Sequence, residues 1–500
     1  MFETEESRPW HQTLPGLIMA SVLLPPVGIV LLWMRRGSPL FAKALGTVGL
    51  IVLAAAYVFV FNGWRGSGRN EAHYTEIEQD RARQQIVAAH QPTSPQPQAS
   101  RGQPAAAASP GAAAFAHATR NYWTNYRGPN RDGRYEELPV LTSWPAGGLT
   151  PIWKQPVGIG YASFTVADGV AFTIEQRRRQ EMVVAYDLNT GRELWTQGWN
   201  AEYTDSTGDG PRATPVWDDG RLYALGATGE LRCLDAKTGL VIWGKNILTE
   251  NGASNLPWAM AASPLIVDDK VIVQPGGSNG NSVVAYAKSN GAPVWKSLDD
   301  KQAYVSPMLV TLDGRRQILV VSATRAAGLV PESGRLLWSY TWETEMGINA
   351  AQPVIVGPNR FFISSGYGKG AAVVEINGGS PRTIWENVYM KNKFNSSVLY
   401  QGYVYGLDEG ILTCLDVNTG ERKWKGGRYG YGQLILAGGN LIVITDTGEL
   451  ALVRAAPDQF SETARFQAIE GKTWNYPAIA GGRLLVRNGN QMAAYNIAAK

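Results

Sequence analysis

The sequence predicts an all-β fold: an eight-bladed β-propeller of four-stranded blades at residues 119–500, preceded by a two-helix transmembrane hairpin and a disordered linker. Three observations predict this organisation. The composition, with 56 Gly, 17 Trp and 21 Tyr but only 18% charged residues, suits short strands joined by tight turns. A Thr-Gly-x-x-x-Trp element recurs, and two uncharged stretches lie near the amino terminus. The net charge of +4 is small and dispersed, so we expect no nucleic-acid partner.

The two uncharged stretches span residues 14–34 and 44–61. Each approaches the roughly 20 residues that a helix needs to cross a bilayer core. A cleaved signal peptide is the alternative for the first stretch, but such a peptide has a basic start, whereas this chain begins with three glutamates in its first six residues. The sequence therefore predicts a transmembrane hairpin at residues 1–64.

The orientation of this hairpin depends on basic residues. The loop between the spans holds Arg35, Arg36 and Lys43, and the flanks on the other side hold an equal number of arginines. Because the loop charges are confined to ten residues, they favour a cytoplasmic loop. We therefore expect a two-pass protein of the cell membrane whose large domain is periplasmic or extracellular, with the membrane and envelope proteins as partners.

A polar linker is expected at residues 65–118. From about residue 91 it is rich in Pro, Ala and Gln, a composition that cannot bury a core. We interpret it as a spacer between the membrane and the domain.

The repeat is clearest in CLDAKTGLVIW at residues 233–243 and CLDVNTGERKW at residues 414–424. Gly permits the positive φ of the turn, and Trp is expected to fill space between blades. Weaker copies keep the same Gly-to-Trp spacing, except for one longer turn before Trp385. The structural repeat residues are Gly191 and Trp195, Gly239 and Trp243, Gly291 and Trp295, Gly334 and Trp338, Trp385, and Gly420 and Trp424.

The number of blades follows from a second pattern. Two apolar segments flanking a turn recur eight times, about 48 residues apart, and four short strands per unit are typical of a propeller. The last unit stops after its third strand, while LTPIWKQ at residues 149–155 precedes the first full unit. We expect this segment to supply the missing outer strand and close the ring. Cys233 and Cys414 then fall in units two and six, too far apart for a disulfide.

The xLDxxTGxxxW element resembles the repeat of the pyrroloquinoline-quinone (PQQ) propellers, which include quinoprotein alcohol dehydrogenases and the assembly lipoprotein BamB. NYRGPNRDG at residues 125–133 and GPRATP at residues 210–215 further resemble bacterial PQQ-like proteins. The resemblance implies the fold. In the enzymes of the family it also implies PQQ with Ca²⁺ and a carboxylate base. The adjacent-cysteine pair of those enzymes is absent here, so the cofactor stays unknown.

Candidate site residues lie at the starts of the inner strands, which should ring the channel mouth. Cations, amides and aromatic faces converging there can hold a polar planar ligand or an acidic peptide. The alternative is that they only satisfy strand ends around a water-filled channel. No metal site is predicted, and no spacing marks a carboxylate as a base, so no catalytic residue is predicted. The candidate ligand-binding residues are Arg212, Trp258, Asn349, Lys393, Asn395 and Trp474.

Two functions are compatible with these observations. The first is a membrane-anchored extracytoplasmic propeller that acts as a ligand-binding or protein-assembly scaffold. The alternative is a divergent PQQ-dependent alcohol dehydrogenase that passes electrons to a membrane acceptor. Whether the protein is an enzyme stays open at this stage.

Overall fold

The computed structural model describes residues 121–499 and a few isolated positions between residues 33 and 81. The chain divides into two units, residues 1–81 and 82–500. The predicted spans at 14–34 and 44–61 and the predicted linker lie almost wholly outside the described residues. No helix in the described part of the chain is long and apolar enough to cross a bilayer.

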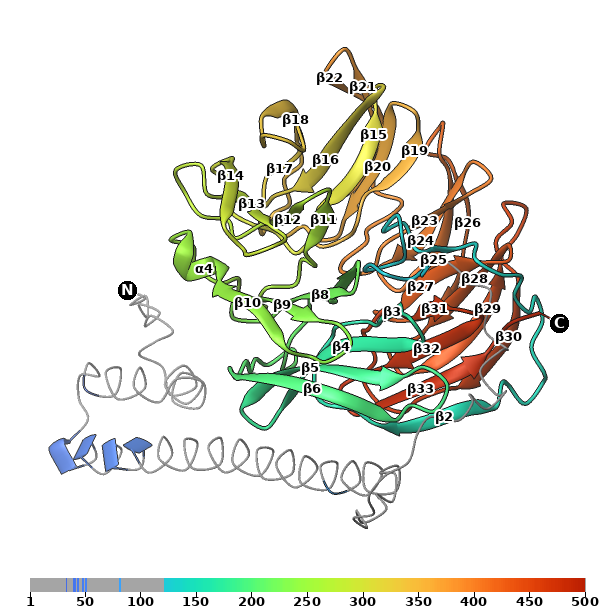
Figure 1. The fold of residues 1–500 in the computed structure, drawn as a ribbon, viewed down its shortest axis with the longest axis horizontal. Helices are drawn as coiled ribbons and strands as arrows, with labels where there is room; N and C mark the ends of the chain where they lie inside the picture. Colours follow the sequence, from blue (N-terminus) through green and yellow to red (C-terminus); the bar gives the residue numbers. More distant parts are fainter. Residues whose placement is uncertain are drawn as a thin grey trace, which may run out of the picture. The chain divides into compact units, whose positions relative to one another are not determined.

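The second unit is an eight-bladed propeller, as predicted. Eight sheets follow one another in chain order, which Figure 1 traces from green through yellow to red. The first blade contains β3 (Thr165–Ala167), β4 (Val170–Arg177), β5 (Gln180–Asp187) and β6 (Glu193–Asn200). The second contains β7 (Val216–Asp218), β8 (Arg221–Leu225), β9 (Glu230–Asp235) and β10 (Val241–Asn246), followed by the short helix α4 (Ile247–Glu250). The third contains β11 (Leu265–Val267), β12 (Lys270–Val273), β13 (Val283–Ala287) and β14 (Pro293–Ser297). The fourth contains β15 (Met308–Leu312), β16 (Arg315–Val321), β17 (Arg325–Leu329) and β18 (Leu336–Thr341).

The remaining blades repeat the same order. The fifth contains β19 (Val354–Gly357), β20 (Arg360–Ser365), β21 (Gly370–Asn377) and β22 (Ser380–Asn387). The sixth contains β23 (Val398–Tyr400), β24 (Tyr403–Asp408), β25 (Ile411–Asp416) and β26 (Arg422–Arg428). The seventh contains β27 (Gln433–Ala437), β28 (Asn440–Ile444), β29 (Glu449–Arg454) and β30 (Glu462–Gln467). The eighth contains β31 (Ala478–Ala480), β32 (Arg483–Arg487), β33 (Gln491–Asn496) and, from the start of the domain, β2 (Pro151–Pro156).

Strand direction defines two faces of the propeller. The first strand of each blade is innermost, and the strands within a blade are antiparallel. The turns after the first and third strands therefore share one face, the turn face. The blade-to-blade connections lie on the other, the connection face. At the first turn of blade one, Asp168 and Gly169 both have positive φ, 51° and 76°, as a two-residue type I′ hairpin requires.

The repeated Trp joins neighbouring blades. The Trp195 indole donates a hydrogen bond to the Ala236 carbonyl, 3.1 Å away in the next blade. Gly239 of that next turn has φ 75°, and a Cβ there would lie 2.6 Å from the Trp195 ring. The turn thus needs Gly both for conformation and for space. Equivalent bonds link Trp243 to Lys288, Trp295 to Pro331, Trp385 to Val417 and Trp424 to Ala456. Trp338 instead donates to Gln317 of its own blade.

The ring closes as predicted. Strand β2 pairs with β33, and the Trp153 indole donates to the Leu188 carbonyl of blade one at 3.0 Å. In blade seven, Ala464 stands at the position where other blades carry the repeated Trp. Trp144 packs edge-on against Phe466 of the same strand, with ring centroids 5.7 Å apart. A segment outside the blades therefore supplies that aromatic bulk.

Cys233 and Cys414 are free and fully buried. Each pairs across the third and fourth strands with the Trp of its blade, where blades one, three, four and eight carry Ala or Gly. They are small residues that fill a repeated position, as the sequence indicated.

The domain predicted from residue 119 begins with a segment that the sequence did not assign to a blade, an axial hairpin of residues 121–138. Both its ends lie at the turn face: Asn121 bonds Asp168, and Glu137 accepts from the Gly481 amide. Its strand β1 (Arg134–Tyr135) pairs in parallel with the inner strand β27 and adds a fifth strand to that sheet. The hairpin therefore enters the propeller channel from the turn face.

Candidate functional site: an aromatic pocket at the channel mouth

A pocket of about 440 Å³ opens on the connection face. Much of its lining comes from one position of the blade, the residue four before the inner strand. In seven of the eight blades this residue lines the pocket, namely Tyr161, Arg212, Ala261, Tyr304, Ala350, Phe394 and Trp474. Equivalent positions converge here because the inner strands surround the propeller axis. The pocket is thus an axial one.

A ring of hydrogen bonds fixes the backbone two residues beyond this position. The Ser163 amide donates to Thr214 Oγ1, the Thr214 amide to Ser263 Oγ, and the Ser263 amide to Ser306 Oγ, at 2.8–2.9 Å. On the far side, Tyr476 Oη donates to Ser396 Oγ at 2.7 Å. All these hydroxyls are buried, so the ring holds the lining residues in place before any ligand arrives.

The lining forms two aromatic walls. The first wall consists of Phe394, Tyr431, Trp474 and Tyr161, whose neighbouring rings lie 4.9–6.1 Å apart. The second wall consists of Trp258 and Tyr304, with centroids 5.7 Å apart. These two residues precede blades three and four, whereas Tyr431 and Trp474 precede blades seven and eight. In a ring of eight, the walls therefore face one another.

The axial hairpin closes the floor. Tyr126, at its tip, lines the pocket. Behind it, the buried Arg131 donates from Nη1 to the carbonyls of Ser263 and Pro307, at 3.2 and 2.8 Å, and from Nη2 to that of Pro264. The buried Arg127 donates to the Ser397 carbonyl at 3.0 Å. The sequence NYRGPNRDG held one signal for this hairpin. Its two arginines belong to no blade, so they need hydrogen-bond partners elsewhere in the fold if they are buried.

Arg212 holds the loop at one end of the pocket. Its guanidinium donates to Asp205 Oδ2 at 2.8 Å and to the carbonyls of Gly208 and Gly210 at 2.7 and 2.6 Å. Burial alone would raise the pKa of Asp205, but hydrogen bonds from Thr207 and the charge of Arg212 hold that pKa below its ordinary value. Asp205 therefore stays ionised and largely neutralises the charge of Arg212.

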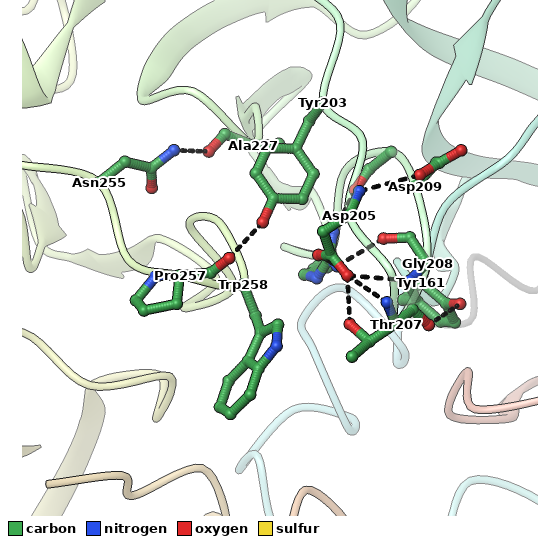
Figure 2. Close-up of polar contacts among 12 residues, drawn as sticks. Tyr161, Tyr203, Asp205, Thr207, Gly208, Asp209, Ala227, Asn255, Pro257 and Trp258 are labelled. Carbon is green, nitrogen blue, oxygen red and sulfur yellow. Dashed lines mark hydrogen bonds and ion pairs between the residues drawn. The ribbon is translucent and has the colours of Figure 1, made fainter. Parts of the chain in front are cut away.

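The same loop is tied to the next connection. Figure 2 shows the Tyr203 hydroxyl donating to the Pro257 carbonyl, at 2.5 Å, beside Trp258. It also shows Asp205 accepting from Thr207 and the Asn255 amide donating to the Ala227 carbonyl. The loop of Asp205 and the second wall are thus joined by a direct hydrogen bond.

Four of the six predicted site residues line the pocket: Arg212, Trp258, Lys393 and Trp474. Asn349 and Asn395 do not; both are buried and serve the connections. Asn349 donates to the Ser322 carbonyl at 2.9 Å, and Asn395 accepts from Asn392 at 3.1 Å. Whether any of the six binds a ligand stays a prediction. Sequence reasoning missed the tyrosines at 126, 304 and 431.

The lining suits part of the cofactor that the resemblance implies. The aromatic walls, Arg212 and Lys393 fit a flat molecule with carboxylates. A bound Ca²⁺ needs carboxylate ligands, and none of the described lining residues is Asp or Glu. Across the described part of the chain, no three His, Cys, Asp or Glu side chains are grouped to hold a metal ion. The donor set therefore fits the rings of PQQ but not its metal.

Comparison with known proteins gives the family of the repeat. The family model described as outer membrane protein assembly factor BamB matches residues 179–426. This stretch carries PQQ-like propeller repeats. Quinohemoprotein alcohol dehydrogenase ADH IIB of Pseudomonas putida is 32% identical over 136 residues, 26% of this chain and 19% of that protein. The 1-butanol dehydrogenase (cytochrome c) of Thauera butanivorans is 25% identical over 166 residues, 31% of this chain and 23% of that protein.

The propeller also resembles solved structures. BamB from Moraxella catarrhalis superposes with a TM-score of 0.51 at 18% identity, covering 70% of this chain and all of that one. Quinohemoprotein alcohol dehydrogenase from Comamonas testosteroni superposes with a TM-score of 0.55 at 13% identity, covering 77% and 81%. Both likenesses concern the fold alone. The chain spans only about a quarter or less of the curated relatives it matches in sequence.

Proposed function

We propose that this PQQ-like propeller is a binding module that takes a small ligand in its axial pocket. The observation that carries the proposal is the convergence of seven equivalent blade positions on one pocket, where four of them join Trp258 and Tyr431 in two facing aromatic walls over a closed floor. A volume of about 440 Å³ lies within the range of small-molecule sites, roughly 300–1,000 Å³. Strand ends around a water-filled channel would not need such walls.

Asn121, the first residue of the propeller that the structure describes, lies at the turn face, opposite the pocket. We propose that residues 1–64 anchor the protein in the cell membrane and that the propeller is periplasmic or extracellular, where envelope proteins are its partners. This part rests on the uncharged amino-terminal stretches.

The second candidate function is a divergent PQQ-dependent alcohol dehydrogenase. The sequence matches to alcohol dehydrogenases and the stacking walls favour it. The missing carboxylates in the described lining weigh against it, because alcohol oxidation needs a base within hydrogen-bond reach of the substrate hydroxyl. The binding module is therefore the better-supported function.

A ligand screen tests the proposal. The full chain is screened against one- to three-ring aromatic compounds by ligand-observed NMR. We expect ligands whose signals broaden with the native chain and not with Trp258→Ala, which removes half of the second wall. Tyr389→Ala is the matched control, since Tyr389 is an exposed aromatic outside the pocket. An equal loss in both variants, or no ligand at all, would contradict the proposal.

A second measurement separates the two functions. The full chain is titrated with PQQ and CaCl₂, and reduction of an electron-accepting dye is followed with short-chain alcohols as substrates. We expect no turnover. Saturable stabilisation by PQQ accompanied by alcohol-dependent dye reduction would establish the dehydrogenase instead.

A further inference from the structure

One peptide group holds both ends of the loop that carries Trp258. The carbonyl of Ala227, in the turn between β8 and β9, accepts from the Asn255 side-chain amide at 2.9 Å and from the Met260 backbone amide at 3.1 Å. Trp258 lies between these two residues in the chain, and Figure 2 shows the first of the two bonds beside it. The position of the second aromatic wall therefore depends on where Ala227 lies.

A buried carboxylate fixes Ala227 from the other side. Glu181, near the start of β5, is fully buried, and its Oε1 accepts from the Ala227 amide at 2.8 Å. Its Oε2 accepts from the Trp199 indole at 3.0 Å. The fit is close, since a Cβ at Gly226 would lie 2.1 Å from Glu181 Oε2. Glu181 does not line the pocket, but a single peptide group connects it to the loop of the second wall.

Several groups act on the charge of this carboxyl group. Burial is the largest influence and raises the pKa of Glu181 to about 7. The two hydrogen bonds and the charge of Arg212 act in the opposite direction, and the charge of Glu230 raises the pKa further. Arg232, whose guanidinium lies 4.7 Å from the centre of the Trp199 ring, is itself paired with Glu230 at 3.0 Å. Glu181 therefore changes charge near neutral pH.

Protonation changes what the carboxyl group offers its neighbours. A carboxylate has two charged acceptor oxygens, whereas a carboxylic acid carries a hydroxyl in place of one of them. Hydrogen bonds to a charged acceptor are roughly twice as strong as neutral ones, so the bond to the Ala227 amide weakens when the charge is lost. Loss of a buried charge still favours the folded state as a whole, because burying a carboxylate costs more than burying the neutral acid.

We propose that Glu181 is a positioning residue for the axial pocket. As a carboxylate it fixes the Ala227 turn and, through that turn, the loop of Trp258; once protonated it releases this loop. The second wall is then held in place above neutral pH and loosened below it. The inference adds regulation by protons to the proposed binding function and rests on that function for its purpose, but its test needs no ligand.

Fluorine NMR tests the inference. The full chain is labelled with 5-fluorotryptophan, and the resonance that disappears in Trp258→Phe is followed across the neutral pH range without any ligand. We expect this resonance to shift with a midpoint near pH 7. The propeller residues include no histidine, and burial raises the pKa values of Tyr203 and Tyr304, beside Trp258, to about 12. The histidines and tyrosines of this region therefore do not account for such a midpoint.

Glu181→Gln removes the titration. The neutral amide resembles the protonated acid in size and charge, so at alkaline pH its Trp258 resonance should stay where the native chain has it at acidic pH. Trp199→Phe removes a donor that favours the charged form and should move the midpoint upwards by about one pH unit. Glu375→Gln is the matched control, because Glu375 is a buried glutamate of blade five. It should leave the midpoint unchanged.

The possible outcomes separate the inference from the binding function. A Trp258 resonance that does not titrate, or that titrates equally in Glu181→Gln, would overturn the inference and leave the binding function standing. If Glu181→Gln does not fold, an unshifted midpoint in Trp199→Phe would overturn it instead. The expected titration together with an empty aromatic screen would remove the binding function and keep Glu181 as the residue that positions the loop.

Discussion

The ring of Tyr126 meets the ring of Tyr476 edge-on, with centroids 5.3 Å apart. Tyr126 belongs to the axial hairpin and Tyr476 to the connection into the last blade, and both line the pocket. The start and the end of the domain therefore meet at the pocket floor. Any change that releases the hairpin should alter stability and pocket together.

Arg131→Met should release the hairpin. The substitution leaves the buried carbonyls of Ser263, Pro264 and Pro307 without their donor, at about 1–3 kcal/mol for each carbonyl that finds no other partner. We expect the free energy of unfolding to fall by about 3 kcal/mol or more in guanidinium titrations. Arg134→Met, in the same hairpin but in a part-exposed ion pair, should change it by less than about 1 kcal/mol. Similar losses in both would contradict the role of the buried guanidinium.

Arg212 and Asp205 should act as a unit. Their side chains are 11% and 16% exposed, and together they hold the loop beside the pocket. A double-mutant cycle with Arg212→Met and Asp205→Asn should show a coupling of about 1–3 kcal/mol in the free energy of unfolding, because either change leaves the other group without its opposite charge. Additive effects would mean that the ion pair does not organise the loop.

Glu181 should make the stability depend on pH. It is fully buried, accepts from the Trp199 indole at 3.0 Å and the Ala227 amide at 2.8 Å, and burial raises its pKa to about 7. Since the folded pKa exceeds the unfolded one, the folded state holds the proton more tightly. The free energy of unfolding should therefore fall as pH rises from about 4.5 to 7, by up to about 3 kcal/mol.

The control for this pH dependence is Glu181→Gln. It cannot titrate, so its stability should lack this decline across the same range. Chemical denaturation at several pH values measures the difference between the two proteins. If both lose stability in parallel, other groups are responsible and Glu181 stays ionised at neutral pH.

Trp153→Ala should open the ring at its closure. Trp153 packs against Gly191 of blade one and donates to Leu188, so the change removes a buried ring between the last and first blades. We expect a loss of about 3–5 kcal/mol in the free energy of unfolding. Trp153→Phe, which keeps an aromatic ring, should lose about 1 kcal/mol. An effect of Trp153→Ala no larger than that of Trp258→Ala at the pocket rim would argue against the closure.

The repeat made much of the fold predictable. The Gly and Trp spacing reflects contacts between adjacent blades, such as Trp195 with Gly239, and these recur at a fixed distance in sequence. The unmatched strand at residues 149–155 predicted the closure for the same reason. The seventh blade could not be predicted in detail, because Trp144 fills it from outside the repeat.

The site was only partly predictable. The sequence placed Arg212, Trp258, Lys393 and Trp474 at the channel mouth because inner strands begin there. It could not separate them from Asn349 and Asn395. A shift of one residue along a connection decides whether a side chain lines the pocket or makes buried hydrogen bonds within the connections.

The sequence by itself determined the eight-bladed ring, its closure and the structural role of the two cysteines, because each depends on local turns or on contacts repeated from blade to blade. Only the tertiary structure decided that residues 121–138 fill the channel, and that residues from six blade connections form two facing walls above Tyr126. These features depend on contacts between segments that are far apart in the sequence, and no repeated spacing along the chain predicts those contacts.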